Sequence, residues 1–432
     1  MNPNVQTPLQ SSPTSSPKDV ARARLDRLEG FLRADPNNAS LLADAFQTAL
    51  QSAEWERAQF HVSHGKALHP EDLQWPLREG DLLLAQQRFG EAKDLLESLL
   101  QTPNAAPAFL DAVLHNMAYA DFQQGDFVAC VQRLAERLDA AGLAAEAGQQ
   151  QQPAPALAAM QILWLRALHR TGEIDRAVAW TKAAATVVTP AAAGVASLAA
   201  LDAGDVAAAG QWSALALQHA GAQDRPMEAL VTQASLALAA RNATGARALA
   251  GQALQLNDKD GRAWSALAFA DLLAAQPKPA REHFALALTY MPGHIGTWHG
   301  QGWTDLLLRD LDAALLSFQT ALELDRNFAE SHGGLAVVLA LKGMRAEAEE
   351  HIERAARLDR ANLSGRYAQA ILSGEVSDMQ ALQRLAKRLL GDRAAPLGGA
   401  MYDSLSHLWA QAEGDAGADA VRGDTQQDQQ ES

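Results

Sequence analysis

Apolar residues recur along the second half of the chain with the spacing of helices that bury one face. Trp264, Leu267 and Ala268 stand at i, i+3 and i+4, although Asp271 interrupts the pattern at i+7. After a Pro-rich break over residues 275–279, a second stretch again keeps its apolar positions on one face. These positions are Ala280, Phe284, Ala287 and Leu288. A Pro-Gly pair stops the second stretch, so the pattern predicts two antiparallel helices joined by a short turn.

This pair of helices repeats every 34 residues. Trp264 and Trp298 stand one period apart, and so do Phe284 and Phe318. Two ladders of alanine keep the same period. They are Ala246, Ala280, Ala314 and Ala348, and Ala253, Ala287, Ala321 and Ala355. A fixed period of this length is typical of stacked helix pairs, in which small residues allow close approach of the helices.

The residues at the repeated positions resemble those of the tetratricopeptide repeat family. The repeat that starts at Gly261 matches all seven signature positions, with Trp264, Leu267, Ala268, Ala280, Phe284, Ala287 and Pro292. The next repeat departs from the signature at Gln301 and Arg326, and the third has His332 in place of Trp. The resemblance is most specific over residues 227–362. It implies an all-α fold, a right-handed superhelical solenoid of antiparallel helix pairs.

Extending the same register outward predicts about nine repeats with flanking segments. The expected organisation is a disordered tail over residues 1–17, a capping helix and about three repeats over 18–138, a Gln/Pro/Ala-rich linker over 139–157, about six repeats over 158–362, a shortened repeat with capping helices over 363–411, and a disordered tail over 412–432. In the C-terminal part, helices are expected over 365–372, 378–390 and 399–411. Caps are expected because an end repeat would otherwise expose its stacking face.

The resemblance also implies a concave groove, lined by the first helix of each repeat. The predicted partner-binding residues are the large side chains at groove positions: Phe269, Leu272, Leu273, His299, Trp303, Leu306, Leu307, Val337 and Leu341 in the C-terminal repeats, and Tyr119 and Phe122 nearer the N-terminus. Large apolar side chains on a wet surface indicate a binding patch, and Trp and Tyr are favoured anchors. The alternative interpretation is that these residues pack on neighbouring helices.

Two specialised forms of the family are not matched. The positions of the basic clamp that holds carboxylate termini carry Leu77, Asp81 and Asn116, or Val231, Ser235 and Ala266. The asparagine ladder of arrays attached to sugar-transferring enzymes is represented by Asn116 alone. The resemblance therefore implies protein binding without naming the ligand.

Charge and composition narrow the classes of partner. The net charge of −15 argues against nucleic acid and against docking on an anionic membrane surface. The single cysteine, Cys130, excludes a disulfide within the chain and stands at a small stacking position, where a buried, inert thiol is expected. The N-terminus lacks the apolar core of a signal peptide, and the uncharged stretch 183–201 is too weakly hydrophobic to favour a membrane span.

No pattern of catalytic or metal-binding residues emerges. His61, His64 and His69 lie close together, but no ligand of suitable spacing completes a metal site, so we interpret them as surface histidines. We expect no enzyme activity, metal or cofactor. The prediction is a cytoplasmic adaptor or scaffold that binds a peptide or partner helix. The alternative is a chaperone or accessory factor for a secreted or membrane-assembly client, with a membrane-associated or secretion-system partner.

Overall fold

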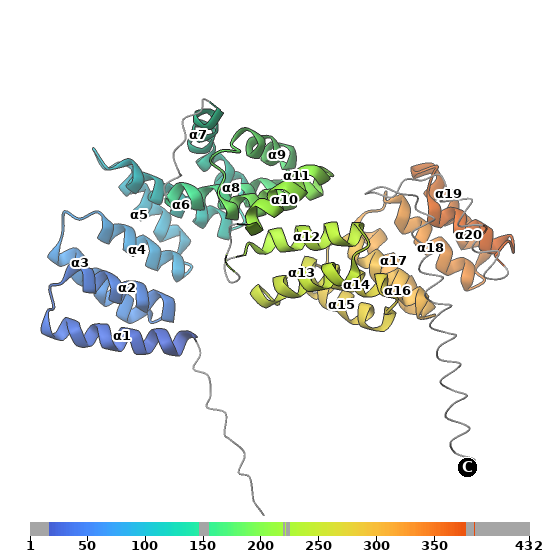
Figure 1. The fold of residues 1–432 in the computed structure, drawn as a ribbon, viewed down its shortest axis with the longest axis horizontal. Coiled ribbons are helices and arrows are strands. Elements are labelled where there is room, and N and C mark those ends of the chain that lie inside the picture. The colour runs from blue at the N-terminus through green and yellow to red at the C-terminus, as the bar shows by residue number, and fades with distance from the viewer. Residues whose placement is uncertain (1–16, 147–154, 219–220, 222–224, 377–383, 385–432) are drawn as a thin grey trace, which may run out of the picture. The chain divides into compact units, whose positions relative to one another are not determined.

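The chain folds as helices throughout the part that the computed structural model describes, which is residues 17–146, 155–218, 221, 225–376 and 384. Two compact units divide the chain, residues 1–192 and 193–432, here called the N-terminal and C-terminal units. The division falls inside one helix, α10 (Pro190–Asp202), and not at the predicted linker. Figure 1 labels the helices of both units.

The helices of the N-terminal unit are α1 (Pro17–Ala34), α2 (Ala39–Ser52), α3 (Trp55–Leu68), α4 (Gln74–Ala85), α5 (Phe89–Leu100), α6 (Pro107–Gln123), α7 (Phe127–Glu146), α8 (Pro155–Thr171) and α9 (Ile174–Ala183). Those of the C-terminal unit, after α10, are α11 (Val206–Gln218), α12 (Met227–Ala239), α13 (Ala243–Leu256), α14 (Gly261–Leu273), α15 (Pro277–Tyr290), α16 (Ile295–Leu307), α17 (Leu311–Leu324), α18 (Ala329–Leu341), α19 (Arg345–Leu358) and α20 (Leu363–Leu372). Within the described residues, α2 to α19 follow one another as nine successive helix pairs, with α1 before them and α20 after them.

The period of 34 residues is visible in the helix boundaries. The first helices of the regular repeats begin at Met227, Gly261, Ile295 and Ala329, and α20 begins one period later at Leu363. Their second helices begin at Ala243, Pro277, Leu311 and Arg345. Each repeat of this run therefore has the same number of residues in its first helix, in its second helix and in each turn. The predicted tetratricopeptide-like helix pairs are confirmed.

Both alanine ladders lie in the core of the helix stack. Ala246, Ala280, Ala314 and Ala348 are fully buried, and so are Ala253, Ala287, Ala321 and Ala355. Phe284 and Phe318, which stand one period apart, are fully buried beside them. A larger side chain at a ladder position would force the two helices of a repeat apart, since protein cores have no spare volume.

The turn inside each regular repeat has one left-handed residue at a fixed position. These residues are Arg241, Ala275, Arg309 and Gly343, with φ of 60°, 55°, 61° and 76°. Only Gly343 takes this conformation without a steric penalty, because glycine has no Cβ. The other three repeats keep the same turn although a side chain is disfavoured there.

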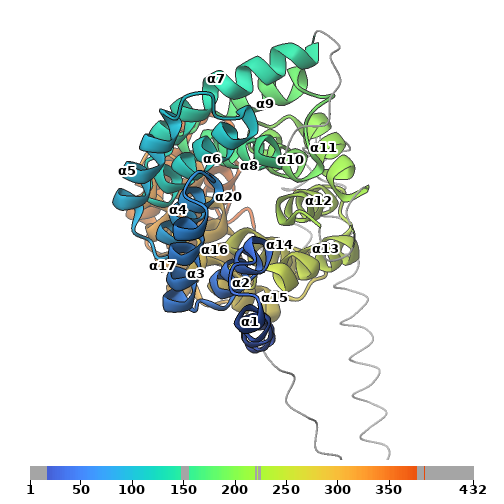
Figure 2. The same cartoon turned by 90° about the vertical axis from the view of Figure 1, so that its left-hand side faces the viewer.

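The N-terminal helix α1, here called the capping helix, lies against the first helix pair. Leu25 and Leu32 are buried against the first helix pair, and Glu29 accepts hydrogen bonds from Arg57 of α3 through both of its oxygens. Figures 1 and 2 both show α1, α2 and α3 side by side. The Arg57 guanidinium lowers the pKa of Glu29, so this ion pair favours the folded cap at neutral pH.

The linker predicted over residues 139–157 is helical at both ends. Helix α7 continues to Glu146 and α8 begins at Pro155, while residues 147–154 lie outside the described residues. The helix predicted over 365–372 is present and begins at Leu363. The helices predicted over 378–390 and 399–411, and both tails, lie outside the described residues apart from Pro17 and residue 384. The uncharged stretch 183–201 falls on parts of two helices, and no described helix is both long and apolar enough to span a membrane.

Buried acidic side chains on some first helices form ion pairs with basic side chains of the preceding repeat. Asp271 is fully buried, and its carboxylate lies 2.5 Å from Nη2 of Arg247 and 2.6 Å from Nδ1 of His283. One period later, Asp305 is buried with Nε of Arg281 at 3.0 Å. The apparent lapse at Asp271 in the apolar pattern is therefore an inter-repeat ion pair.

The same arrangement occurs in the N-terminal unit. Asp121 of α6 is buried, 3.1 Å from Nζ of Lys93 in the preceding repeat and 2.8 Å from Nε of Arg133. In the interface one period after Asp305, both positions are apolar. Leu339 is buried, and Leu315 of the preceding repeat packs against its cluster. The two positions are matched across the interface between repeats.

Candidate partner-binding surface

Five of the apolar residues predicted for the groove stand in one row of equivalent repeat positions on the first helices α14, α16 and α18. We define this row, the apolar strip, as Phe269, Leu273, Trp303, Leu307 and Leu341. Phe269, Leu307 and Leu341 are 37%, 66% and 46% exposed, and Leu273 and Trp303 are half-buried. Because the repeats have the same length, the strip places equivalent side chains on neighbouring helices.

Phe269 has a fixed orientation on its helix. Its ring meets Phe284 edge to face, with centroids 4.9 Å apart and an interplanar angle of 85°. Gly300 of the next repeat makes room for both rings, since a Cβ there would lie 2.4 Å from Phe284 and 3.0 Å from Phe269. An aromatic ring that is held in one place and still exposed loses little entropy on binding a partner.

Trp303 has a double role. Its ring packs edge-on against Phe318 at 5.6 Å, and the side chain borders two core clusters, one with Phe318 and Leu335 and one with Val337 and Ala368. Leu306 borders the same two clusters, and Leu272 packs against the cluster of Ala268, Ala280 and Phe284. These residues contribute to packing as well as to the surface.

Two of the predicted groove residues are buried. Val337 is fully buried, and His299 is 8% exposed with Nε2 2.9 Å from Oγ of Ser331. Burial lowers the pKa of His299 to about 4, so the ring is neutral at physiological pH. Neither side chain is accessible to a partner in this structure, because each fills the contact with the following helices.

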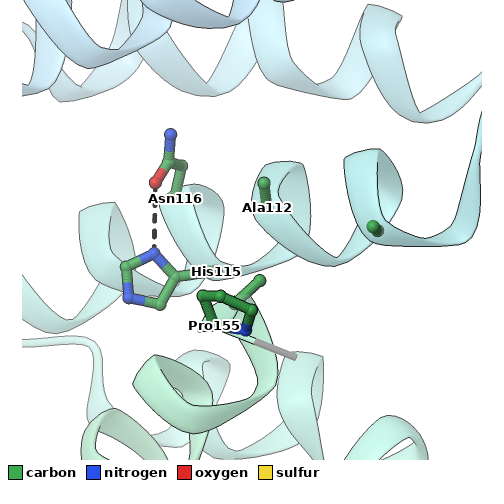
Figure 3. Close-up of a pocket in the computed structure, with 6 residues that line it drawn as sticks. Ala112, His115, Asn116 and Pro155 are labelled. Carbon is green, nitrogen blue, oxygen red and sulfur yellow. Dashed lines mark hydrogen bonds between the residues drawn. The ribbon is translucent and has the colours of Figure 1, made fainter. Parts of the chain in front are cut away.

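The N-terminal unit has a separate surface on α6. Tyr119 is 37% exposed, whereas Phe122 is half-buried and packs against Phe127 with centroids 5.0 Å apart. One turn before Tyr119 lies His115, beside Asn116, and both line a cavity between α6 and the start of α8 (Figure 3). The sequence placed Asp81 and Asn116 at the positions of the basic clamp, but it did not reveal that both are hydrogen-bonded in series with His115.

The histidines of α3 are not the surface group that the sequence suggested. His61 is buried, and Nε2 lies 3.0 Å from Oε1 of Glu29, which belongs to the capping helix. Burial lowers the pKa of His61, although Glu29 opposes this shift. His64 is directed to the backbone oxygen of Pro36 at 3.2 Å. Helix α1 covers α3, and the spacing of residues in the sequence does not show this contact.

Metal and thiol chemistry have no visible site in the described part of the chain. It contains no group of three His, Cys, Asp or Glu side chains that could hold a metal ion. Cys130 is buried, as predicted, and burial raises the pKa of its thiol to about 12. A thiol with so high a pKa is a poor nucleophile at neutral pH.

Known proteins resemble this chain in fold over part of its length. No family model and no curated protein matches the sequence. A crystal structure of MamA shares 15% identity at a TM-score of 0.32, covering 37% of this chain and 92% of the other. The MamA RS-1 ArsTM double mutant shares 19% identity at a TM-score of 0.32, over 38% and 91% of the two chains. YrrB, described as a TPR protein with an unusual peptide-binding site, shares 18% identity at a TM-score of 0.30, over 49% and 91%.

Proposed function

We propose that this chain, an array of tetratricopeptide-like helix pairs, is a non-catalytic, cytoplasmic adaptor that binds a partner helix or peptide on the apolar strip. The observation that carries the proposal is the exposure of Phe269, Leu307 and Leu341 on the same side of three successive first helices. Large apolar side chains that are rimmed by polar residues and left in water mark interaction surfaces. The single, buried cysteine is compatible with a reducing compartment.

The spacing of the strip suits an amphipathic helix. Packed helices lie about 8–10 Å apart, so equivalent residues on α14, α16 and α18 recur at about that distance. Seven residues of a helix rise by roughly 10 Å. A partner helix that crosses the three first helices would therefore meet them in turn with apolar residues at about i, i+7 and i+14.

The decisive variant is Leu307→Glu, because Leu307 is the most exposed residue of the strip. A carboxylate there would be buried without a partner by any apolar ligand, so partner capture should fall by at least about thirtyfold. Affinity capture of the full chain, followed by mass spectrometry and then by titration of the recovered partner, measures the loss.

The matched control is Leu316→Glu, which makes the same change at a residue of the second helix α17 that is 64% exposed. It should leave both binding and the circular dichroism spectrum unchanged. Trp303→Ala is a less clean test, because loss of its contact with Phe318 also weakens the fold. Equal loss of the partner from both Glu variants, or from neither, would contradict the proposal.

A further inference from the structure

Two histidines meet inside the repeat that begins at Ala329, His332 on α18 and His351 on α19 (Figure 1 labels both helices). Their Nδ1 atoms lie 2.9 Å apart, and Nε2 of His332 lies 3.1 Å from the backbone oxygen of Arg326. His332 is buried and His351 is half-buried. The contact therefore belongs to the packing of α18 against α19, the two helices of this repeat.

His332 makes a hydrogen bond that tryptophan makes in the two preceding repeats. Nε1 of Trp264 donates to the backbone oxygen of Asp258, and Trp298 makes the same bond to the residue six positions before it. Arg326 stands at the same distance along the chain from His332. A carbonyl oxygen only accepts, so the ring of His332 carries a proton on Nε2. In the neutral ring this leaves a lone pair on Nδ1.

The repeat of His351 lacks the acid that pairs with the equivalent histidine two periods earlier. There, Nδ1 of His283 lies 2.6 Å from Oδ2 of the buried Asp271. The position of Asp271 holds Leu339 in the repeat of His351. Nδ1 of His351 faces the lone pair of His332 instead, and it must therefore be the nitrogen that carries the proton of this contact.

The contact holds one proton between two nitrogen atoms, which limits the number of protons that the closed pair can take. A first proton from water adds to Nε2 of His351 and keeps its Nδ1–H group as a donor. A second proton would have to occupy Nδ1 of His332, so that two N–H groups would face each other at 2.9 Å. In the open pair both rings can be charged, since the unperturbed pKa of histidine is about 6.5.

The charged neighbours of His351 on its own helix do not favour its protonation. Burial lowers the pKa of His351, and the positive charges of His332 and Arg354 act in the same direction, while Glu350 opposes them. Glu350 and Arg354 also bind each other, with Nη2 and Oε1 2.6 Å apart. The ion pair therefore offers His351 little net compensation for a charge.

Charged and titratable groups of the other helices around the pair bind elsewhere, are exposed or stay neutral. Glu330 of α18 accepts hydrogen bonds from Asn362 and Ser364, Asp312 of α17 pairs with Lys342, and His299 and Asp305 of α16 contact Ser331 and Arg281. Glu323, Arg326 and Arg366 are exposed, and burial raises the pKa of Tyr367 on α20. The acid response of the contact is therefore assigned to the two rings.

We propose that His332 and His351 form an acid-operated latch between α18 and α19, which is closed while the two Nδ1 atoms share one proton and opens when both rings become charged. The latch needs no partner, so it is independent of binding at the apolar strip. Because the open pair binds one proton more than the closed pair, the open population should rise at least about tenfold for each unit of pH below about 6.5.

The shared proton is tested by NMR of the full-length protein labelled with ¹⁵N-histidine. The variants His332→Gln and His351→Gln each remove one set of ring signals, which identifies the two residues. At neutral pH, Nε2 of His332 and Nδ1 of His351 should be protonated, and the other nitrogen of each ring should not. A protonated Nδ1 on His332, or an unprotonated Nδ1 on His351, overturns the proposal.

Opening is measured by labelling of a thiol at a ladder position. Ala348→Cys places the thiol in the buried cluster that α19 forms with α18, and Ala314→Cys is the matched control one period earlier. Dithiodipyridine, which reacts with thiols in acid, labels each site when its repeat opens. From about pH 6.5 to about pH 5.5, the ratio of the labelling rate in Ala348→Cys to that in Ala314→Cys should rise at least about tenfold.

His332→Gln is the decisive variant, combined with each cysteine. Its amide can donate to the oxygen of Arg326 and accept from His351, but it takes up no proton, so the rise in the ratio should disappear. His332→Trp, which recreates the stack of Trp264 on His283, is a second route to the same result. His283→Gln changes a histidine outside the pair and should leave the rise unchanged. A full tenfold rise in both His332 variants overturns the proposal.

Discussion

Two successive interfaces of the C-terminal unit solve the same packing problem with opposite chemistry. Between the repeats that begin at Gly261 and Ile295, Arg281 reaches the buried carboxylate of Asp305 at 3.0 Å. One period later the equivalent positions are Leu315 and Leu339, which pack together with Ala340 and Ala348. The backbone spacing is the same in both, so the fold itself does not require either chemistry.

The comparison shows that the two positions act as a matched pair. A buried acid is tolerated where the preceding repeat supplies a cation, as Arg247 does for Asp271 and Lys93 for Asp121. An isolated buried charge would cost far more than an apolar residue in the same place. Repeats of this chain are therefore not interchangeable, because each is adapted to its neighbour.

The largest expected effect comes from mixing the two chemistries. Leu339→Asp places a carboxylate opposite Leu315, and we expect it to lower the free energy of unfolding by about 3–5 kcal/mol, the usual consequence of an unpaired buried charge. Leu315→Arg in the same chain recreates the geometry of Arg281 and Asp305 and should recover at least half of the loss. Urea unfolding followed by circular dichroism measures both variants.

Leu316→Asp is the control for this pair, because the same substitution is made at an exposed residue of α17. It should change the urea midpoint little. If adding Leu315→Arg restored none of the stability lost in Leu339→Asp, the ion pair with Arg281 would not be the reason that a buried aspartate is tolerated at Asp305.

Mild acid should change the stability of the two interfaces differently, and we expect this effect to be intermediate in size. His299 is buried as a neutral ring in the interface that also contains Leu339, hydrogen-bonded to Ser331, and its pKa is lowered to about 4. A histidine with a lowered pKa contributes stability that is complete above about pH 6.5 and is lost as the pH falls toward 4. The loss should reach about 2 kcal/mol at pH 5.

The interface that contains Asp305 should respond to acid in the opposite direction. Burial raises the pKa of Asp305, so its protonation on acidification favours the folded state. Urea midpoints of the wild type and of His299→Gln at pH 7 and pH 5 test this difference. The variant should lose part of the acid sensitivity, whereas an unchanged difference between the two pH values would show that His299 is not buried as a neutral ring.

The regular features of the fold could be predicted from the sequence, and the features that depend on neighbouring repeats could not. The alanine ladders and the period gave the helix pairs, because small size and spacing are properties of one repeat. The burial of Asp271 was missed, since its cation Arg247 lies in the preceding repeat. A search for acids paired with cations one repeat earlier could have found it.

The candidate surface was predicted in part for the same reason. Phe269, Leu307 and Leu341 are exposed at the expected positions, but Val337 and His299 are covered by the helices that follow. His61 is covered by α1 through Glu29. Position within a repeat predicts which face a residue occupies, whereas its exposure depends on the size of the side chains contributed by the neighbouring repeats.

The smallest expected effect concerns an ion pair of ordinary length that lies outside any interface. Arg354 and Glu350 are one turn apart on α19, with Nη2 and Oε1 at 2.6 Å, and both side chains are more than half exposed. Arg354→Gln should cost less than about 0.5 kcal/mol, and the cost should disappear in about 1 M salt, because water and ions screen exposed charges. Arg281→Gln breaks a pair of similar length but leaves the buried Asp305 without its cation, so it should cost about 1–3 kcal/mol and keep most of that cost in salt. Urea unfolding of both variants at low and high salt makes the comparison. Equal losses would mean that the contribution of an ion pair to the stability of this chain depends on the proximity of the two charges alone. Its position in an interface between repeats would then have no influence.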